Sequence, residues 1–111
     1  MLNGSPDWHS MRIEGVGPIS RVVAVFQIGP PLERLPFPSF KVKVLERANG
    51  SFLAIPNVTI LEPDGLPGWE AGLGGTVEEA LEDALRRFIH NFEMRKPGSD
   101  ADFAWADPGE F

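Results

Sequence analysis

The chain has 111 residues, a length that normally forms one domain around a single core. Hydrophobic residues make up 42% of it, including eight phenylalanines, which predicts a folded domain rather than a disordered one. The formal net charge of −6 disfavours nucleic acid as a partner and favours a basic protein. Because there is no cysteine, disulfides and thiolate catalysis are excluded. With no apolar run of membrane-spanning length and no secretory leader pattern, we expect a cytoplasmic protein that binds no membrane.

The N-terminal part, residues 1–18, mixes glycines and prolines with scattered polar side chains, which predicts a loosely ordered lead-in with room for a short strand at residues 11–13. A single α+β domain is expected over residues 19–96. Its first element, residues 21–28, is a dense β-branched run and is expected to be a strand covered on both faces. Pro36 and Pro38 should keep the link that follows extended and outside a central ladder.

A β-hairpin is predicted next. In residues 40–46, apolar side chains alternate with the exposed lysines Lys41 and Lys43, as in a half-buried antiparallel strand. Asn49-Gly50 then predicts a type I′ turn, and a return strand begins at Ser51. Pro56 should mark a bulge or an edge position, with pairing able to resume over residues 58–61.

A glycine-rich loop leads into the one long helix, predicted over residues 76–95. A short strand is expected before the helix, with Trp69, Ala71 and Leu73 on its inner face. The loop of residues 72–76 has two interpretations. It could cradle a phosphate, or it could simply make a tight strand-to-helix turn; the second is favoured because acidic residues in the first helical turn would repel an anion. Thr76 and Glu79 form a capping box.

The predicted helix carries one apolar stripe, which should pack on the strand residues Phe40, Val42 and Val44, with Phe52 and Ala54 alongside. The expected fold is therefore α+β, a mostly antiparallel twisted sheet of three to five strands with one long helix on one face. The stripe consists of Val77, Leu81, Ala84, Leu85, Phe88 and Phe92.

The C-terminal tail, residues 97–111, sets large aromatic residues among acids. One interpretation is that it folds back as a last strand at residues 102–106. The other is a docking peptide whose aromatics anchor in a partner while its carboxylates meet a basic surface. The candidate partner-binding residues are Asp100, Asp102, Phe103, Trp105, Asp107 and Phe111.

Catalytic, cofactor and metal sites are not predicted. The chain has only two histidines, His9 and His90, and neither stands in a cluster with the spacing of a metal or acid–base site. The lysines Lys41 and Lys43 are interpreted as a solvated sheet face rather than as an RNA-binding surface. We therefore expect a protein that is not an enzyme and has no cofactor.

The order of these elements resembles a known family. The residues that carry the resemblance lie within about residues 40–92: alternating apolar positions ending at Glu46, then Gly50-x-Phe52-x-Ala54-x-Pro56, then Gly68-Trp69 and Gly74-x-Thr76-x-Glu78-Glu79-Ala80-Leu81. This pattern is similar to the HicB-like antitoxin domain.

The resemblance implies a partial RNase-H-like sheet with one helix, a homodimer, and a role in occluding a small basic toxin that cleaves mRNA. Such antitoxins usually add a C-terminal DNA-binding segment, but the acidic residues after this helix are too few to form one, so DNA binding is not expected. An alternative is an orphan module with a structural, regulatory or immunity role. Such a module would bind an unknown partner or form a homo-oligomer. A third hypothesis, a small hydrolase or nucleotide binder, depends only on the loop of residues 72–76.

Overall fold

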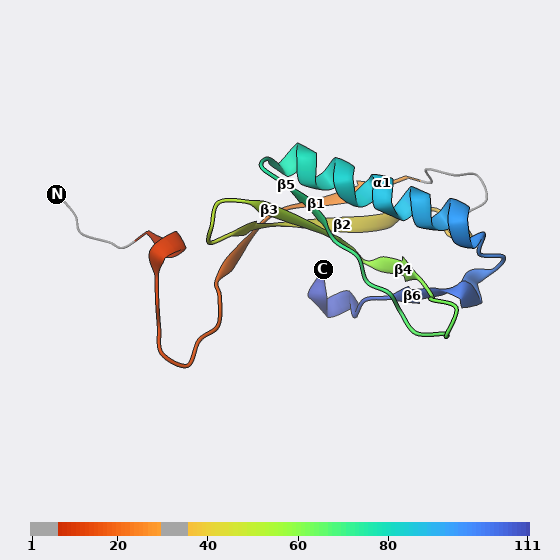
Figure 1. Cartoon of the computed structure of the whole chain (residues 1–111), viewed down its shortest axis with the longest axis horizontal. Helices are drawn as coiled ribbons and strands as arrows, with labels where there is room; N and C mark the ends of the chain where they lie inside the picture. Colours follow the sequence, from red (N-terminus) through yellow and green to blue (C-terminus); the bar gives the residue numbers. More distant parts are fainter. Residues whose placement is uncertain (1–6, 30–35) are drawn as a thin grey trace.

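The computed structural model describes residues 7–29 and 36–111. In this part of the chain, a four-stranded antiparallel sheet of order β1-β2-β3-β5 is covered on one face by the helix α1, and β4 and β6 form a small second sheet (Figure 1). The predicted α+β class is confirmed. The elements are η1 (Trp8–Ser10), β1 (Ser20–Ile28), β2 (Phe40–Arg47), β3 (Phe52–Pro56), β4 (Val58–Ile60), β5 (Gly72–Gly74), α1 (Val77–Arg95), η2 (Asp100–Asp102), β6 (Phe103–Trp105) and η3 (Pro108–Glu110).

The N-terminal segment begins with the 3₁₀ helix η1. Residues 1–6 and 30–35, which belong to the predicted lead-in and the proline-rich link, lie outside the described residues. The strand predicted at residues 11–13 is not present: Met11 caps η1 through its N–H, which donates to Trp8, and the chain then turns, with Val16 donating to the Ile13 carbonyl. These local bonds take up the backbone groups that strand pairing would need.

β1 differs from its prediction. Within the described residues it lies at an edge of the sheet and pairs only with β2, and Val22 and Val25 are 54% and 46% exposed. The prediction of a strand covered on both faces is therefore wrong. The apolar run is continuous because a β-bulge between Val22 and Ala24 turns two neighbours, Val23 and Ala24, toward the core together.

The β2–β3 hairpin is confirmed, but its turn is not type I′. Gly50 has a φ of 86°, whereas Asn49 does not have a positive φ, so only one of the two residues adopts the conformation that a type I′ turn requires. The Gly50 N–H donates to the Arg47 carbonyl and the Arg47 N–H to the Ser51 carbonyl, at 2.9 and 2.8 Å. This is a three-residue loop, a type I turn followed by glycine in the left-handed region.

At Pro56 the chain leaves the main sheet. Pro56 is the last residue of β3 and lies opposite Val42, in agreement with the predicted interruption. Asn57 then bonds to Lys41 through both its backbone N–H and its side-chain oxygen, each at 2.8 Å. Pairing resumes in β4, but with β6 rather than with β2.

The helix α1 begins at the predicted cap residue, Thr76, but the predicted capping box is not formed. The Thr76 hydroxyl accepts from the Glu79 N–H at 3.0 Å, while the Glu79 carboxylate accepts from Gly75, one residue before the cap. Lys96 ends the helix in the left-handed conformation with φ 47°.

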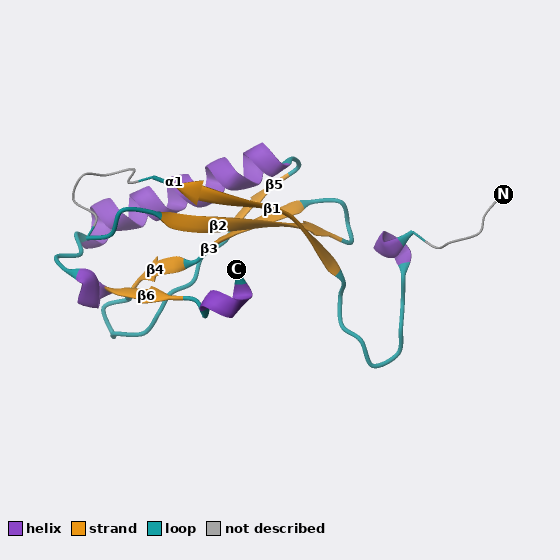
Figure 2. Ribbon diagram, turned by 180° about the vertical axis from the view of Figure 1, so that it is seen from behind, coloured by secondary structure: helices purple, strands orange, loops and turns teal. Residues whose placement is uncertain are grey.

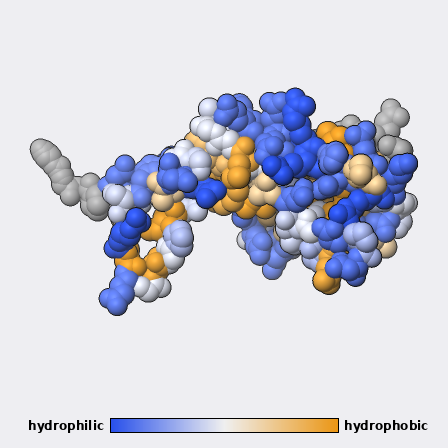
Figure 3. Space-filling model, in the orientation of Figure 1, coloured by the Kyte–Doolittle hydropathy of each residue, from blue (hydrophilic) through white to orange (hydrophobic). Residues whose placement is uncertain are grey.

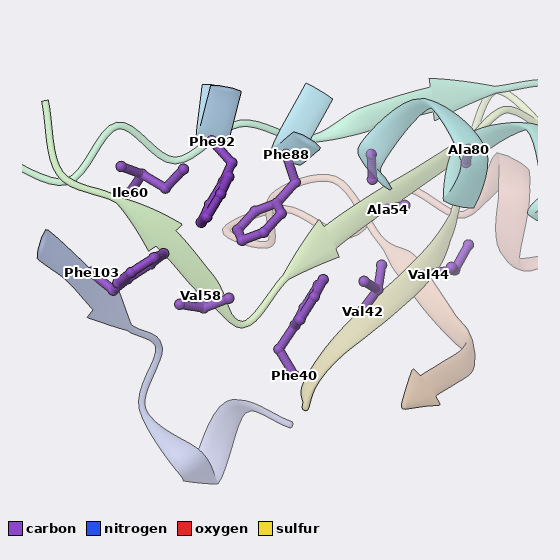
Figure 4. Close-up of a cluster of buried hydrophobic side chains, with 11 residues drawn as sticks. Phe40, Val42, Val44, Ala54, Val58, Ile60, Ala80, Phe88, Phe92 and Phe103 are labelled. Carbon is purple, nitrogen blue, oxygen red and sulfur yellow. The ribbon is translucent and has the colours of Figure 1, made fainter. Parts of the chain in front are cut away.

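The core lies between α1, β2, β3 and the β4–β6 pair (Figure 4). The ring of Phe88 lies 4.9 Å from that of Phe40, so the predicted stripe does meet β2. Ala80, which the predicted stripe did not include, is fully buried, whereas Leu81 and Leu85 are only partly buried. The buried core consists of Phe40, Val42, Val44, Ala54, Val58, Ile60, Ala80, Ala84, Phe88, Phe92 and Phe103.

β5 has the opposite orientation from the one predicted. Trp69 and Leu73, expected on the inner face, are 45% and 51% exposed, and Gly72 faces the helix instead. A β-carbon at Gly72 would lie 2.2 Å from the backbone nitrogen of Ala84, so a side chain there would exclude the helix from the strand. Gly72 is thus needed for a close approach of two backbones and not for a positive φ.

Candidate functional site on the outer face of the sheet

The candidate site lies on the outer face of the main sheet, which we define as the face opposite α1. Because side chains alternate along a strand, the residues between the core positions of β2 and β3 point to this face. They include Lys43, Leu45, Leu53 and Ile55, all half-buried, while Leu73 on β5 is exposed. Seen from the β5 edge, hydrophobic surface lies in a band beneath the polar surface of α1 (Figure 3).

The C-terminal segment covers one end of this outer face, below the sheet in Figure 1. β6 leads into η3, which begins at Asp107: the Asp107 carboxylate accepts from the Gly109 N–H at 2.9 Å. The Phe111 N–H closes the turn on the Pro108 carbonyl at 3.3 Å. A proline at the first position and an aspartate cap therefore shape this short turn locally.

Lys43 holds this segment against the sheet. Its ammonium group donates to the Glu110 carbonyl oxygen at 2.8 Å and lies 4.6 Å from the centre of the Phe111 ring. A cation over an aromatic face is attracted by the negative potential of the ring. Lys43 is therefore not the freely solvated side chain that the sequence predicted, although Lys41 is exposed.

Between the segment and the sheet lies an open cavity of about 330 Å³, which we call the outer-face groove. Its lining combines apolar residues, two aromatic residues and two acidic residues with one lysine. Such a lining suits a side chain that is apolar along its stem and cationic at its tip, as in lysine or arginine. The groove is lined by Lys43, Ile55, Pro56, Trp69, Ala106, Asp107, Glu110 and Phe111.

The structure separates the six predicted partner-binding residues. Asp107 and Phe111 line the groove. Asp102 instead accepts from the Gly98 and Ser99 N–H groups at 2.7 and 3.0 Å, and Asp100 is exposed at the start of η2.

The two aromatics of β6 lie on the other side of that strand, toward the core. Phe103 is only 7% exposed, and the ring of Phe37 contacts both Phe103 and Trp105, at 5.1 and 4.9 Å. The strand predicted at residues 102–106 is thus present as β6, but it pairs with β4 and not with the parent sheet.

Six residues of the groove were not predicted as site residues: Lys43, Ile55, Pro56, Trp69, Ala106 and Glu110. Lys43 and Ile55 lie at outward positions of alternating strands, so their place on one face could have been found from the hairpin register. These residues line the groove together with the last residues of the chain only because of the path that the C-terminal tail takes. The sequence has no local signal for that path.

A polar cluster at the N-terminal end of the molecule joins η1 to β2. Both ring nitrogens of His9 lie 2.6 Å from a carboxylate oxygen, one from Asp7 and the other from Glu46, and Arg21 donates to Glu46 at 2.9 Å. The hydrogen bond to Asp7, and then that to Glu46, raise the pKa of His9. The same bonds lower the pKa values of Asp7 and Glu46. This arrangement is an ion-pair anchor for the N-terminal segment.

A larger cavity, of about 720 Å³, lies between the end of α1 and the turn that follows β4. Two of its charged side chains pair with each other, because Arg95 donates to the Glu62 carboxylate. The groove is the better candidate because it presents carboxylates and aromatic rings together.

The glycine loop before α1 has its backbone groups in use. The Leu73 N–H donates to Asp83 at 2.9 Å and the Gly75 N–H to Glu79 at 2.8 Å. The first bond, together with Arg87, lowers the pKa of Asp83. The chain's own carboxylates thus take the places that a bound phosphate would need.

Comparison with models of known protein families, with curated proteins and with solved structures gave no match. The similarity to HicB-like antitoxins therefore rests on the sequence pattern alone. Over residues 7–29 and 36–111, no group of three or more histidine, aspartate or glutamate side chains is arranged to hold a metal ion. None of the helices in these ranges has the length and apolar character of a membrane span.

Proposed function

We propose that this chain is a non-enzymatic binding protein of the HicB-like antitoxin type, which neutralises a small basic protein by covering its active surface. The observation that carries the proposal is the way the chain holds its own Lys43. An aromatic ring and a backbone carbonyl oxygen receive that ammonium group, and two acidic residues, Asp107 and Glu110, line the same groove. A lysine or arginine of a partner would take the place of Lys43 on this ring and this carbonyl, because two ammonium or guanidinium groups in one groove would repel each other.

Charge supports this assignment. The chain carries −6 overall, and a partner of opposite charge would be drawn to it and oriented by its field. The two rings that line the groove, Trp69, which is 45% exposed, and Phe111, add large apolar anchors of the kind that dominate protein interfaces. In this proposal the partner inserts a basic side chain into the outer-face groove and packs on these rings.

A second candidate function, an orphan structural or regulatory module, is favoured by the burial of Phe103. Because this residue belongs to the core, the first part of the tail serves the fold of the chain itself. The two functions make different predictions for the last five residues, three of which line the groove and none of which belongs to the core.

The experiment uses a chain truncated after Ala106, which lacks η3 and Phe111 but keeps β6. The full chain and the truncated chain are each used to capture proteins from the source cells and are then co-expressed with the captured protein. We expect a small basic protein that arrests growth when expressed alone, that the full chain neutralises, and that the truncated chain fails to neutralise while still folding. Capture of no small basic protein, with no toxin-like reading frame beside the gene, would overturn the proposal.

A further inference from the structure

β1 presents a long free edge. Within the described residues its only strand partner is β2, and Figure 2 shows β1 along the near edge of the sheet. The opposite edge of the sheet is formed by β5, which has only three residues. Free edges of this length are templates for pairing with another strand.

The hairpin hydrogen bonds show which groups of β1 point outward. Lys41 and Arg47 bond on the β3 side of β2, so Val42 and Val44, which alternate with them, bond toward β1. Their partners Phe26 and Ala24 consequently direct their backbone groups at β2. The N–H and C=O groups of the residues between, Val25 and Gln27, are left pointing away from the sheet.

The side chains around this edge are uncharged from Val22 to Gly29. Natural edge strands are usually protected by lysine, by proline or by a bulge. Here a bulge lies at one end, between Val22 and Ala24, and Pro30 follows in the sequence at the other end. The bulge and the end of β1 bound a regular segment, residues 24–28, that has no protecting charge of its own.

We propose that β1 pairs with β1 of a second copy of this chain, antiparallel and across a two-fold axis near Phe26, so that one sheet runs through both copies. Val25 of each copy then lies opposite Gln27 of the other, and each such pair exchanges both of its backbone hydrogen bonds. The bulge and the end of β1 at Ile28 fix the register, because a regular ladder centred on Phe26 fits between them.

The chemistry of the strand favours a second copy as the occupant. The complement of an uncharged, apolar strand is another uncharged strand, because a basic segment would place its charges among Val25, Phe26 and Ile28 without partners. The chain itself carries such a strand, and its centre is self-complementary in the antiparallel sense. This inference does not depend on the proposed function, because the edge and the outer-face groove use different residues.

The test substitutes Val25, whose N–H points away from β2. Val25→Pro removes that outward donor and spares the ladder with β2, Val25→Lys adds an edge charge, and Val25→Thr is the matched control that keeps both the donor and the branched side chain. The mass of each protein is measured by analytical ultracentrifugation over a range of concentrations, with circular dichroism to check folding. If the Val25→Pro variant does not fold, the mass of the Val25→Lys variant alone tests whether β1 forms the interface.

We expect the unmodified chain and Val25→Thr to reach twice the 12.2 kDa chain mass, and the other two variants to dissociate about tenfold more readily or more. The amides of Val25 and Gln27 should exchange with solvent more slowly as the protein concentration rises. A single-chain mass at every concentration would overturn the proposal, as would full dimerisation of Val25→Lys or concentration-independent exchange of these amides.

Discussion

Gly72 and Ala84 bring the backbones of β5 and α1 into direct contact, since a β-carbon on Gly72 would lie only 2.2 Å from the Ala84 nitrogen. We predict that Gly72→Ala lowers the free energy of unfolding by about 1–3 kcal/mol, because the helix must move away from the strand. Chemical denaturation measures this change. Gly75→Ala is the control, because the nearest atom to a β-carbon there is the Glu79 carboxylate at 3.3 Å. Equal stabilities of the two variants would mean that the helix does not lie this close.

The contact between Phe88 and Phe40 predicts a large cavity effect. Phe88→Ala should cost about 3–5 kcal/mol of unfolding free energy, because Phe88 is 6% exposed and packs from α1 against Phe40 of β2. Met94→Ala on the same helix, at a site 70% exposed, should change the stability by less than about 0.5 kcal/mol. A loss below 1 kcal/mol for Phe88→Ala, on the scale of an exposed site, would place the apolar stripe on the wrong face of the helix.

The two ends of the C-terminal tail should respond differently to truncation of their rings. Phe103→Ala should destabilise the chain by about 3–5 kcal/mol, because Phe103 is a core residue. Phe111→Ala should leave thermal stability nearly unchanged and remove the ring that lies beside the Lys43 ammonium group. The Lys43 side-chain resonances, followed by NMR, would then lose the ring-current shift that Phe111 produces. If Phe103→Ala proved harmless, β6 would not be part of the core.

The anchor of the N-terminal segment should work in a pH window. His9 has a raised pKa, so its contribution is complete below its ordinary value of 6.5 and is lost as the pH rises through the raised value. Glu46 has a lowered pKa, so its contribution is complete above its ordinary value of 4.5 and is lost as the pH falls through the lowered value. Protection of residues 7–11 from proteolysis should therefore be greatest between pH 4.5 and 6.5.

NMR titration of the His9 ring checks the cause of this pH dependence. In the unmodified chain the pKa of His9 should lie above 6.5, and Glu46→Gln should lower it because one of its two carboxylate partners is lost. Ser51→Ala, at the far end of the same hairpin turn, is a control that should leave the His9 titration unchanged. A His9 pKa at 6.5 in both proteins would remove the anchor from the account.

The fold was largely predictable because local signals and the apolar pattern agree. The capping residue Thr76, the helix stripe and the alternation of Phe40, Val42 and Val44 together required a helix on a hairpin sheet. The type of the turn at Asn49 was not predictable from the sequence, because Asn-Gly also occurs in a type I turn that is followed by a glycine in the left-handed region. The edge position of β1 was hidden because a bulge produces the same unbroken apolar run as a strand buried on both faces.

The candidate site was less predictable, since it joins residues distant in sequence. Phe111 and Asp107 could be selected from composition alone, but Lys43 and Trp69 meet them only through the path of the chain after β6. The orientation of β5 was predicted wrongly for a physical reason. Glycine carries no side chain, so its place opposite Ala80 and Ala84 is invisible to a search for apolar faces.

The central claim is that the acidic, aromatic outer-face groove receives a basic partner. It is tested most directly by the affinity for the captured basic protein of two double variants that each remove two negative charges. Asp107→Asn with Glu110→Gln keeps the η3 cap, because asparagine also caps, and leaves the Glu110 carbonyl in place. Glu78→Gln with Glu93→Gln makes the same charge change at exposed positions of α1.

We predict that the groove variant binds about tenfold more weakly than the unmodified chain, while the helix variant binds within about twofold of it. Equal losses in the two variants would mean that only the total charge of the chain matters. That result, or an unchanged affinity of the groove variant, would contradict the account.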